Sequence, residues 1–60
     1  MSIAEWKTTW VKTVVDAGFS HTTALDTYKA LYGRDGPDIQ KCAESEAFAL
    51  LGKLDTQQQH

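Results

Sequence analysis

Cys42 and His21 are the two side chains in this sequence that could act as a nucleophile and its base. Nucleophilic catalysis by a thiolate also needs a third group that orients the imidazole, and a pocket in which all three groups meet. Cys42 is the single cysteine, and the other histidine is the last residue. Free cysteines are usually buried apolar residues. We therefore expect Cys42 in the core, His21 in solvent, and no catalytic residues.

Metal, cofactor and membrane binding are not expected either. One cysteine and two histidines do not provide the ligand spacing of a zinc site. Six basic and eight acidic residues give a formal charge of -2, and the two signs are interspersed, which argues against a general phosphate-binding surface. No apolar run has the length of a membrane span, and the start lacks the features of a signal peptide. We expect a cytoplasmic protein that needs no cofactor.

Aromatic residues give the stronger functional indication, and it points to binding. Trp10 falls at the centre of an apolar helical stripe and should lie in the core, with Trp6 at its margin. Phe48 projects almost opposite Ile39 on a predicted third helix, which places its ring toward solvent. Phe48 and Leu51 then form a small apolar patch, and aromatic residues are enriched at binding hot spots. The alternative, equally weighted, is that Phe48 packs against the N-terminal turn or the tail.

Two amphipathic helices are predicted before the first long turn. The first spans about residues 3–16, where Ser2 and Glu5 form a capping box and Gly18 ends the helix. The second spans about residues 20–32, with Ser20 as its cap and Gly33 as its stop. The predicted core faces of these two helices are made by Ile3, Trp6, Trp10, Val11, Val14, Val15, Ala17, Ala24, Leu25, Tyr28, Leu31 and Tyr32.

A third helix is predicted to begin at Pro37, whose fixed backbone angle suits a first helical position. Its expected core face comprises Ile39, Ala43, Ala47, Leu50 and Leu54, and it should end between residues 51 and 54. Residues 55–60 have nothing to bury and are predicted to be a flexible, disordered tail. The fold class is therefore all-α: a small three-helix bundle that forms one domain over residues 1–54.

A family resemblance follows from the first inter-helix turn. The stretch Val14-Val15-Asp16-Ala17-Gly18-Phe19-Ser20, followed by Ala24-Leu25 and Ala30-Leu31, resembles ubiquitin-associated (UBA) domains. These are three-helix bundles with a Met-Gly-Phe/Tyr loop after the first helix, and their third helix often ends in a Leu-Leu pair, as at Leu50-Leu51. The resemblance implies a partner-binding surface made by Ala17, Gly18 and Phe19 together with Leu50 and Leu51. Ala17 stands where the family usually has methionine, which makes the apolar contact smaller.

The function expected from these features is binding to another protein through Phe48, Leu51 and the adjacent helix end. The protein would act as an adaptor or a stoichiometric inhibitor, like many small accessory proteins of phages and bacteria. Homodimerisation through the same patch is an open alternative. A helix-turn-helix DNA-binding regulator is another open alternative, with the second helix (residues 20–32) as its recognition helix. Nucleic acid is nevertheless not the expected partner, because Asp26 on that helix would repel phosphate.

Overall fold

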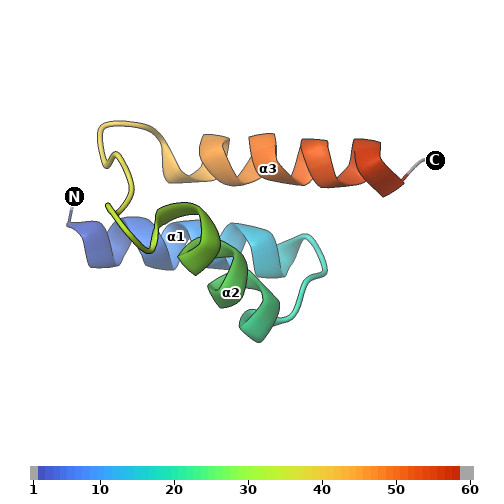
Figure 1. Ribbon diagram of the computed structural model, residues 1–60, viewed down its shortest axis with the longest axis horizontal. Helices are drawn as coiled ribbons and strands as arrows, with labels where there is room; N and C mark the ends of the chain where they lie inside the picture. Colours follow the sequence, from blue (N-terminus) through green and yellow to red (C-terminus); the bar gives the residue numbers. More distant parts are fainter. Residues whose placement is uncertain (1, 59–60) are drawn as a thin grey trace.

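Three α-helices make up the regular structure of this chain: α1 (Ile3–Asp16), α2 (His21–Tyr32) and α3 (Ala43–Gln58) (Figure 1). The computed structural model describes residues 2–58, with side chains described for residues 2–53. No strand occurs in that part of the chain. The predicted all-α, three-helix fold class is therefore confirmed.

The two predicted N-terminal caps are present. The Ser2 hydroxyl oxygen accepts a hydrogen bond from the Glu5 backbone N–H over 3.2 Å, and it also donates to the Glu5 carboxylate. The Ser20 hydroxyl oxygen accepts from the Thr23 backbone N–H over 3.1 Å. These bonds satisfy backbone donors that have no partner within the helix, so α1 and α2 begin where the sequence predicts.

Helix α3 begins six residues later than the sequence predicts, and the assignment of Pro37 to its first turn was wrong. Asp38 forms a turn instead: its side-chain Oδ1 accepts from the Gln40 backbone N–H, and its carbonyl oxygen accepts from the Lys41 N–H. Such local bonds compete with helix formation. Ile39 consequently lies in this turn with 39% of its surface exposed, and it is not a core residue.

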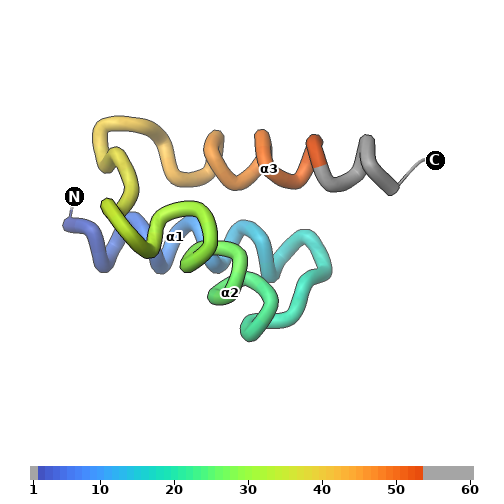
Figure 2. Tube along the Cα trace, viewed as in Figure 1, coloured from blue at the N-terminus to red at the C-terminus, as the bar shows by residue number. Residues whose placement is uncertain are grey.

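Helix α1 is central, because both of the other helices pack against it. Helix α3 lies beside α1 and runs in the same direction, while α2 crosses α1 obliquely (Figure 1). The connection over residues 33–42 returns the chain to the end of the molecule where α1 begins (Figure 2). The loop over residues 17–20 therefore lies at the end toward which α3 runs.

Four aromatic rings join the helices into one core: Trp6 and Trp10 from α1, and Tyr28 and Tyr32 from α2. Edge-to-face packing brings the ring centroids of Trp6 and Tyr32 to 5.3 Å, and those of Trp10 and Tyr28 to 5.5 Å. Trp6 Nε1 also donates to the Lys41 carbonyl oxygen over 2.8 Å, which ties the long connection to α1. Trp6 is thus fully buried and does not lie at the margin of the core as the sequence suggested.

Several residues that the sequence placed in the core are exposed in the structure. Ile3 and Leu31 are more than half exposed, and Ala17 and Cys42 are also exposed. Cys42 precedes the first residue of α3 and is exposed, so its expected burial was wrong. The backbone of α3 continues to Gln58, so the expected end between residues 51 and 54 was wrong. Residues 59 and 60 of the predicted tail, and the side chains from Leu54 onward, lie outside the described residues.

The same substitution at two glycines should have opposite effects on stability. Gly18 has a φ of 111°, a conformation that strains any residue with a Cβ, so Gly18→Ala is expected to lower the free energy of unfolding by about 1–2 kcal/mol. Gly52 lies within α3 and a Cβ there would meet open space, so Gly52→Ala should raise the free energy of unfolding by up to about 1 kcal/mol. Urea denaturation of both variants measures the difference, and a shift in the same direction for both would contradict these assignments.

Candidate functional site

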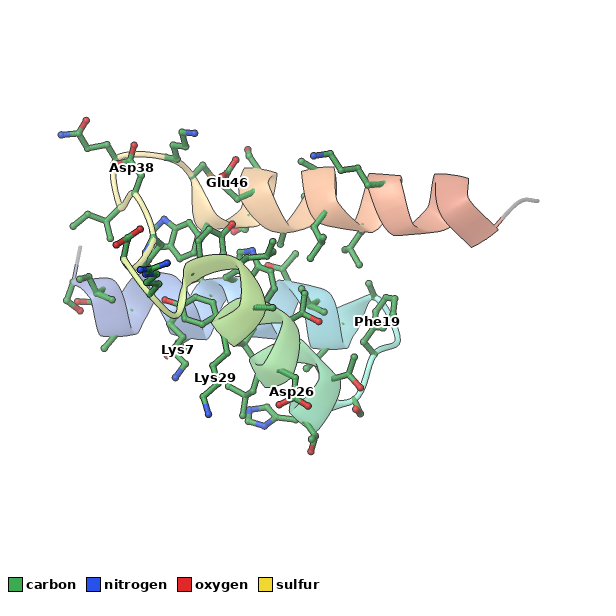
Figure 3. The ribbon with its side chains drawn as sticks, viewed as in Figure 1. Lys7, Phe19, Asp26, Lys29, Asp38 and Glu46 are labelled. Carbon is green, nitrogen blue, oxygen red and sulfur yellow. The ribbon has the colours of Figure 1, made fainter. Side chains whose placement is uncertain are left out.

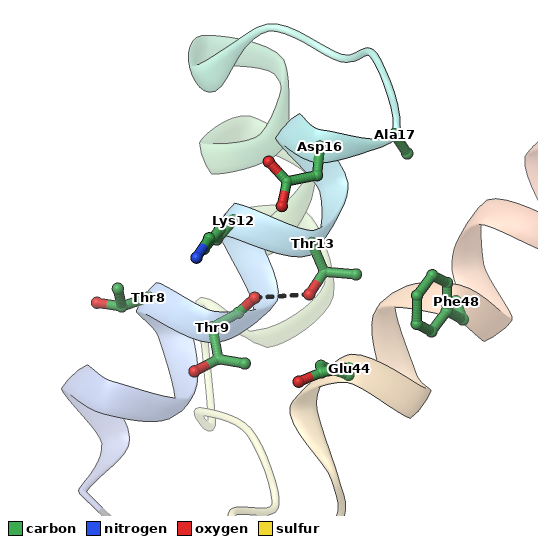
Figure 4. Close-up of a pocket in the computed structure, with 8 residues that line it drawn as sticks. All are labelled: Thr8, Thr9, Lys12, Thr13, Asp16, Ala17, Glu44 and Phe48. Atoms are coloured by element: carbon green, nitrogen blue, oxygen red, sulfur yellow. Dashed lines mark hydrogen bonds between the residues drawn. The ribbon is translucent and has the colours of Figure 1, made fainter.

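A groove of about 510 Å³ runs between α1 and α3 and has Phe48 on one wall (Figure 4). We call it the Phe48 groove. Its α3 wall is formed by Glu44 and Phe48. Its α1 wall is formed by Thr8, Thr9, Lys12, Thr13, Asp16 and Ala17. The Phe48 side chain lines this groove and is 59% exposed, so the sequence-based expectation of a solvent-facing ring is confirmed.

Small residues on α3 explain why this ring lies at a helix–helix seam. Ala43 and Ala47 are buried against α1, and residues four apart lie on the same face of a helix. Phe48 is one residue further round, which places it at the edge of that interface. Alanine at the two buried positions lets the helices approach closely, so a bulky ring beside them stays accessible.

The threonines of the α1 wall present a less polar surface to the groove than their residue type suggests. The Thr13 hydroxyl donates to the Thr9 carbonyl oxygen over 2.9 Å, and the Thr8 hydroxyl donates to the Ala4 carbonyl oxygen over 2.9 Å. Both hydroxyls are thus turned back onto their own helix, as is common for threonine in helices. The Thr13 methyl group points toward the α3 side of the groove (Figure 4). The sequence analysis did not predict this wall, because it depends on the packing of α3 beside α1.

Charged residues of both signs border the groove. Lys12 and Asp16 lie one turn apart on α1, and Glu44 faces them from α3. All three side chains are exposed. A mixed-charge rim around an apolar centre is the usual composition of a protein–protein interface.

Two of the six residues predicted to bind a partner line this groove, namely Ala17 and Phe48. Gly18 follows Ala17 and is exposed. Phe19 and Leu50 are half-buried and pack against the core, so much of their apolar surface is already covered. Leu51 is half-buried on α3. Because α1 and α3 run side by side, the loop at residues 17–19 and the later turns of α3 lie at the same end of the molecule (Figure 1).

Cys42 and His21 are not brought together. His21 begins α2 and Cys42 precedes α3, and these points lie at opposite ends of the molecule (Figure 2). Hydrogen bonding from the Ser45 backbone N–H and hydroxyl, and from the Glu44 N–H, lowers the pKa of the Cys42 thiol below its ordinary value. The thiol is therefore more readily ionised than a free cysteine, but among the described residues no imidazole lies beside it.

The outward residues of α2 bear on the DNA-binding alternative. His21, Thr22, Thr23, Asp26 and Lys29 are all exposed, as that alternative requires. Lys29 and Asp26 are of opposite charge and lie on the same helix. Their charges offset each other, which leaves α2 without the excess of positive charge that binding to phosphate requires.

Neither a metal site nor a membrane span is found in the part of the chain that the structure describes. No three histidine, cysteine, aspartate or glutamate side chains gather there as metal ligands would. None of the helices over those residues combines the length and apolar character needed to cross a bilayer.

Comparison of the chain with protein-family models, with curated proteins and with solved structures finds no match. A functional assignment for this three-helix protein therefore depends on its own surface.

Proposed function

We propose that the protein is a non-enzymatic interaction module that binds another protein through the Phe48 groove. The observation that carries this proposal is the exposed Phe48 ring beside an open groove of about 510 Å³. It would act by occupancy, either blocking a surface of its partner as a stoichiometric inhibitor or bridging two proteins as an adaptor. The exposed thiol of Cys42 fits action in the reducing cytoplasm.

The position of Phe48 supports this proposal over an incidental exposure. Single exposed apolar residues are common and need no functional explanation, and Ile3 and Leu31 fit that description. Phe48 differs because the groove beside it also contains Ala17 and the methyl group of Thr13, and charged residues border it. An aromatic anchor with an apolar surround is the usual centre of a binding hot spot.

Ubiquitin is one partner that this proposal includes. The resemblance to UBA domains implies binding through the loop at residues 17–19, and Ala17 belongs to both that loop and the Phe48 groove. A titration of the ¹⁵N-labelled protein with ubiquitin tests this version directly. Amide shifts at Ala17, Gly18 and Phe48 would support it, and an unchanged spectrum at millimolar ubiquitin would exclude ubiquitin while leaving other partners open.

A pair of matched variants tests the proposal itself. Phe48→Ser is expected to weaken binding to a protein captured by the wild type about thirtyfold or more, because truncating a central aromatic anchor typically removes about 2 kcal/mol or more. Leu31→Ser is the control, since Leu31 is exposed to a similar extent (51% against 59%) but lies on α2, outside the groove. Affinities are measured by titration calorimetry with the captured partner.

Equal binding by Phe48→Ser and the wild type, with both folded by circular dichroism, would refute the proposal. Self-association through the same groove is the competing explanation. Sedimentation velocity over a range of protein concentrations distinguishes it, because a dimer of the wild type would dissociate on dilution and Phe48→Ser would remain monomeric.

A further inference from the structure

A second groove, of about 500 Å³, lies between α1 and α2. We call it the Val11 groove. It lies on the α2 side of α1, whereas the Phe48 groove lies on the α3 side, and Thr8 and Lys12 border both grooves. Its other lining residues, Lys7, Val11, Val15 and Leu25 among them, have no part in the binding proposed for Phe48.

The surface of the Val11 groove is largely apolar. Val11 is buried against the core, Val15 and Leu25 are half-buried, and the exposed Ala4 extends the same face toward the start of α1. Ala4 and Val15 are eleven residues apart, which corresponds to about 16 Å along a helix axis. That length accommodates about three turns of a partner helix.

Positive charge is concentrated along this groove. Lys7 and Lys12 line it, and no carboxylate is among the described residues that do. The Lys7 amine lies 5.5 Å from the centre of the Tyr28 ring, a cation–π contact that holds it near the seam between the two helices. Lys29 projects toward the same side of the molecule, and Asp26 of α2 lies further along that side without lining the groove (Figure 3). This distribution contrasts with the net charge of -2 for the whole chain.

We propose that the Val11 groove binds an acidic amphipathic segment of another protein, with apolar side chains on Val15 and Leu25 and carboxylates beside Lys7 and Lys12. An apolar stripe flanked by carboxylates matches both the apolar surface and the positive charge of the groove, whereas a basic segment would be repelled by the lysines. The protein would then carry two docking surfaces of different chemistry on one central helix. This proposal stands whether or not the Phe48 groove binds a partner.

Titration of the intact ¹⁵N-labelled protein with a synthetic peptide tests this proposal. The peptide has about 16 residues, with leucines at helical i, i+3, i+4, i+7 spacing and glutamates at its polar positions. Its matched control replaces every glutamate by lysine. At low ionic strength we expect the acidic peptide to shift the amides of Val11, Val15 and Leu25, and to bind at least about tenfold more tightly than the basic one.

Charge-reversal variants provide the second measurement. The double variant Lys7→Glu/Lys12→Glu should bind the acidic peptide about tenfold more weakly, because two surface attractions, each worth a few-fold in affinity, become repulsions. The control Lys41→Glu/Lys53→Glu changes the net charge equally at residues outside the groove and should bind within about twofold of the wild type.

Four outcomes would overturn the proposal. They are equal binding of the two peptides, no binding at millimolar peptide, shifts confined to the Phe48 groove, and equal weakening by both double variants. Shifts of Val11 and Leu25 on raising the protein concentration without peptide would assign the groove to a second copy of this chain instead. The comparison of the acidic and basic peptides uses only the wild-type protein, so it tests the proposal even if a charge-reversed variant does not fold.

Discussion

Trp6→Ala is expected to lower the free energy of unfolding by about 3–5 kcal/mol, the range typical of removing a buried aromatic side chain. Trp6 is fully buried, its ring packs on Tyr28 and Tyr32, and its indole N–H binds the connection that leads to α3. A 60-residue domain has a total stability of only about 3–9 kcal/mol. The variant should therefore be partly or wholly unfolded at 25 °C, which far-UV circular dichroism and urea titration would show.

A conservative pair of variants separates the ring of Trp6 from its hydrogen bond. Trp6→Phe keeps an aromatic ring but leaves the Lys41 carbonyl oxygen without its donor. Trp10→Phe changes a neighbouring, equally buried indole whose Nε1 lies near the Tyr32 hydroxyl but makes no hydrogen bond of good geometry within the described residues. Trp6→Phe should therefore cost about 1–2 kcal/mol more than Trp10→Phe. Equal losses would show that the bond to Lys41 does not stabilise the fold.

The first two helices could be predicted from sequence because their determinants are local. The bounds of α1 and the cap of α2 depend on Ser2, Ser20 and Gly18, and each acts on backbone groups within a few residues. Apolar spacing then places Trp10 and Tyr28 on facing sides of the two helices. Such short-range signals are present in the sequence whatever the rest of the chain does.

Long-range contacts explain the errors about α3 and Trp6. Pro37 and Asp38 satisfy the local rules for a helix start, but the bond between Trp6 and Lys41 and the turn at Asp38 hold residues 38–41 in another conformation. The sequence placed Trp6 at the margin of the core because a single apolar stripe was assigned to α1. A helix covered on two sides has a wider buried face, and only the tertiary arrangement shows that α1 is the central helix.

The candidate surfaces could be predicted only in part, for the same reason. Helical spacing placed Phe48 in solvent, and this needs no knowledge of the other helices. The wall opposite Phe48 depends on α1 and α3 lying side by side, and the apolar character of that wall depends on hydroxyl orientation at Thr8 and Thr13. The Val11 groove was not foreseen at all, because Val11 and Val15 were assigned entirely to the core.

Ala47→Glu is expected to cost about 4 kcal/mol or more and to separate α3 from α1. Ala47 is fully buried where these two helices pack, and the contact leaves no room for a longer side chain. A carboxylate placed there is either desolvated without a partner or protonated, and both raise the free energy of the folded state. Because burial would raise the pKa of the new carboxyl above its ordinary value, the loss should diminish as the pH falls toward about 4.

Ala49→Glu is the matched control, two residues along the same helix. Ala49 is exposed, and glutamate is nearly as good a helix former as alanine, so this variant should unfold within about 0.5 kcal/mol of the wild type. Urea denaturation at neutral and acidic pH measures both variants. If Ala47→Glu were as stable as Ala49→Glu, α3 could not pack on α1 through Ala47. The Phe48 groove, whose two walls are these helices, would then not exist in solution.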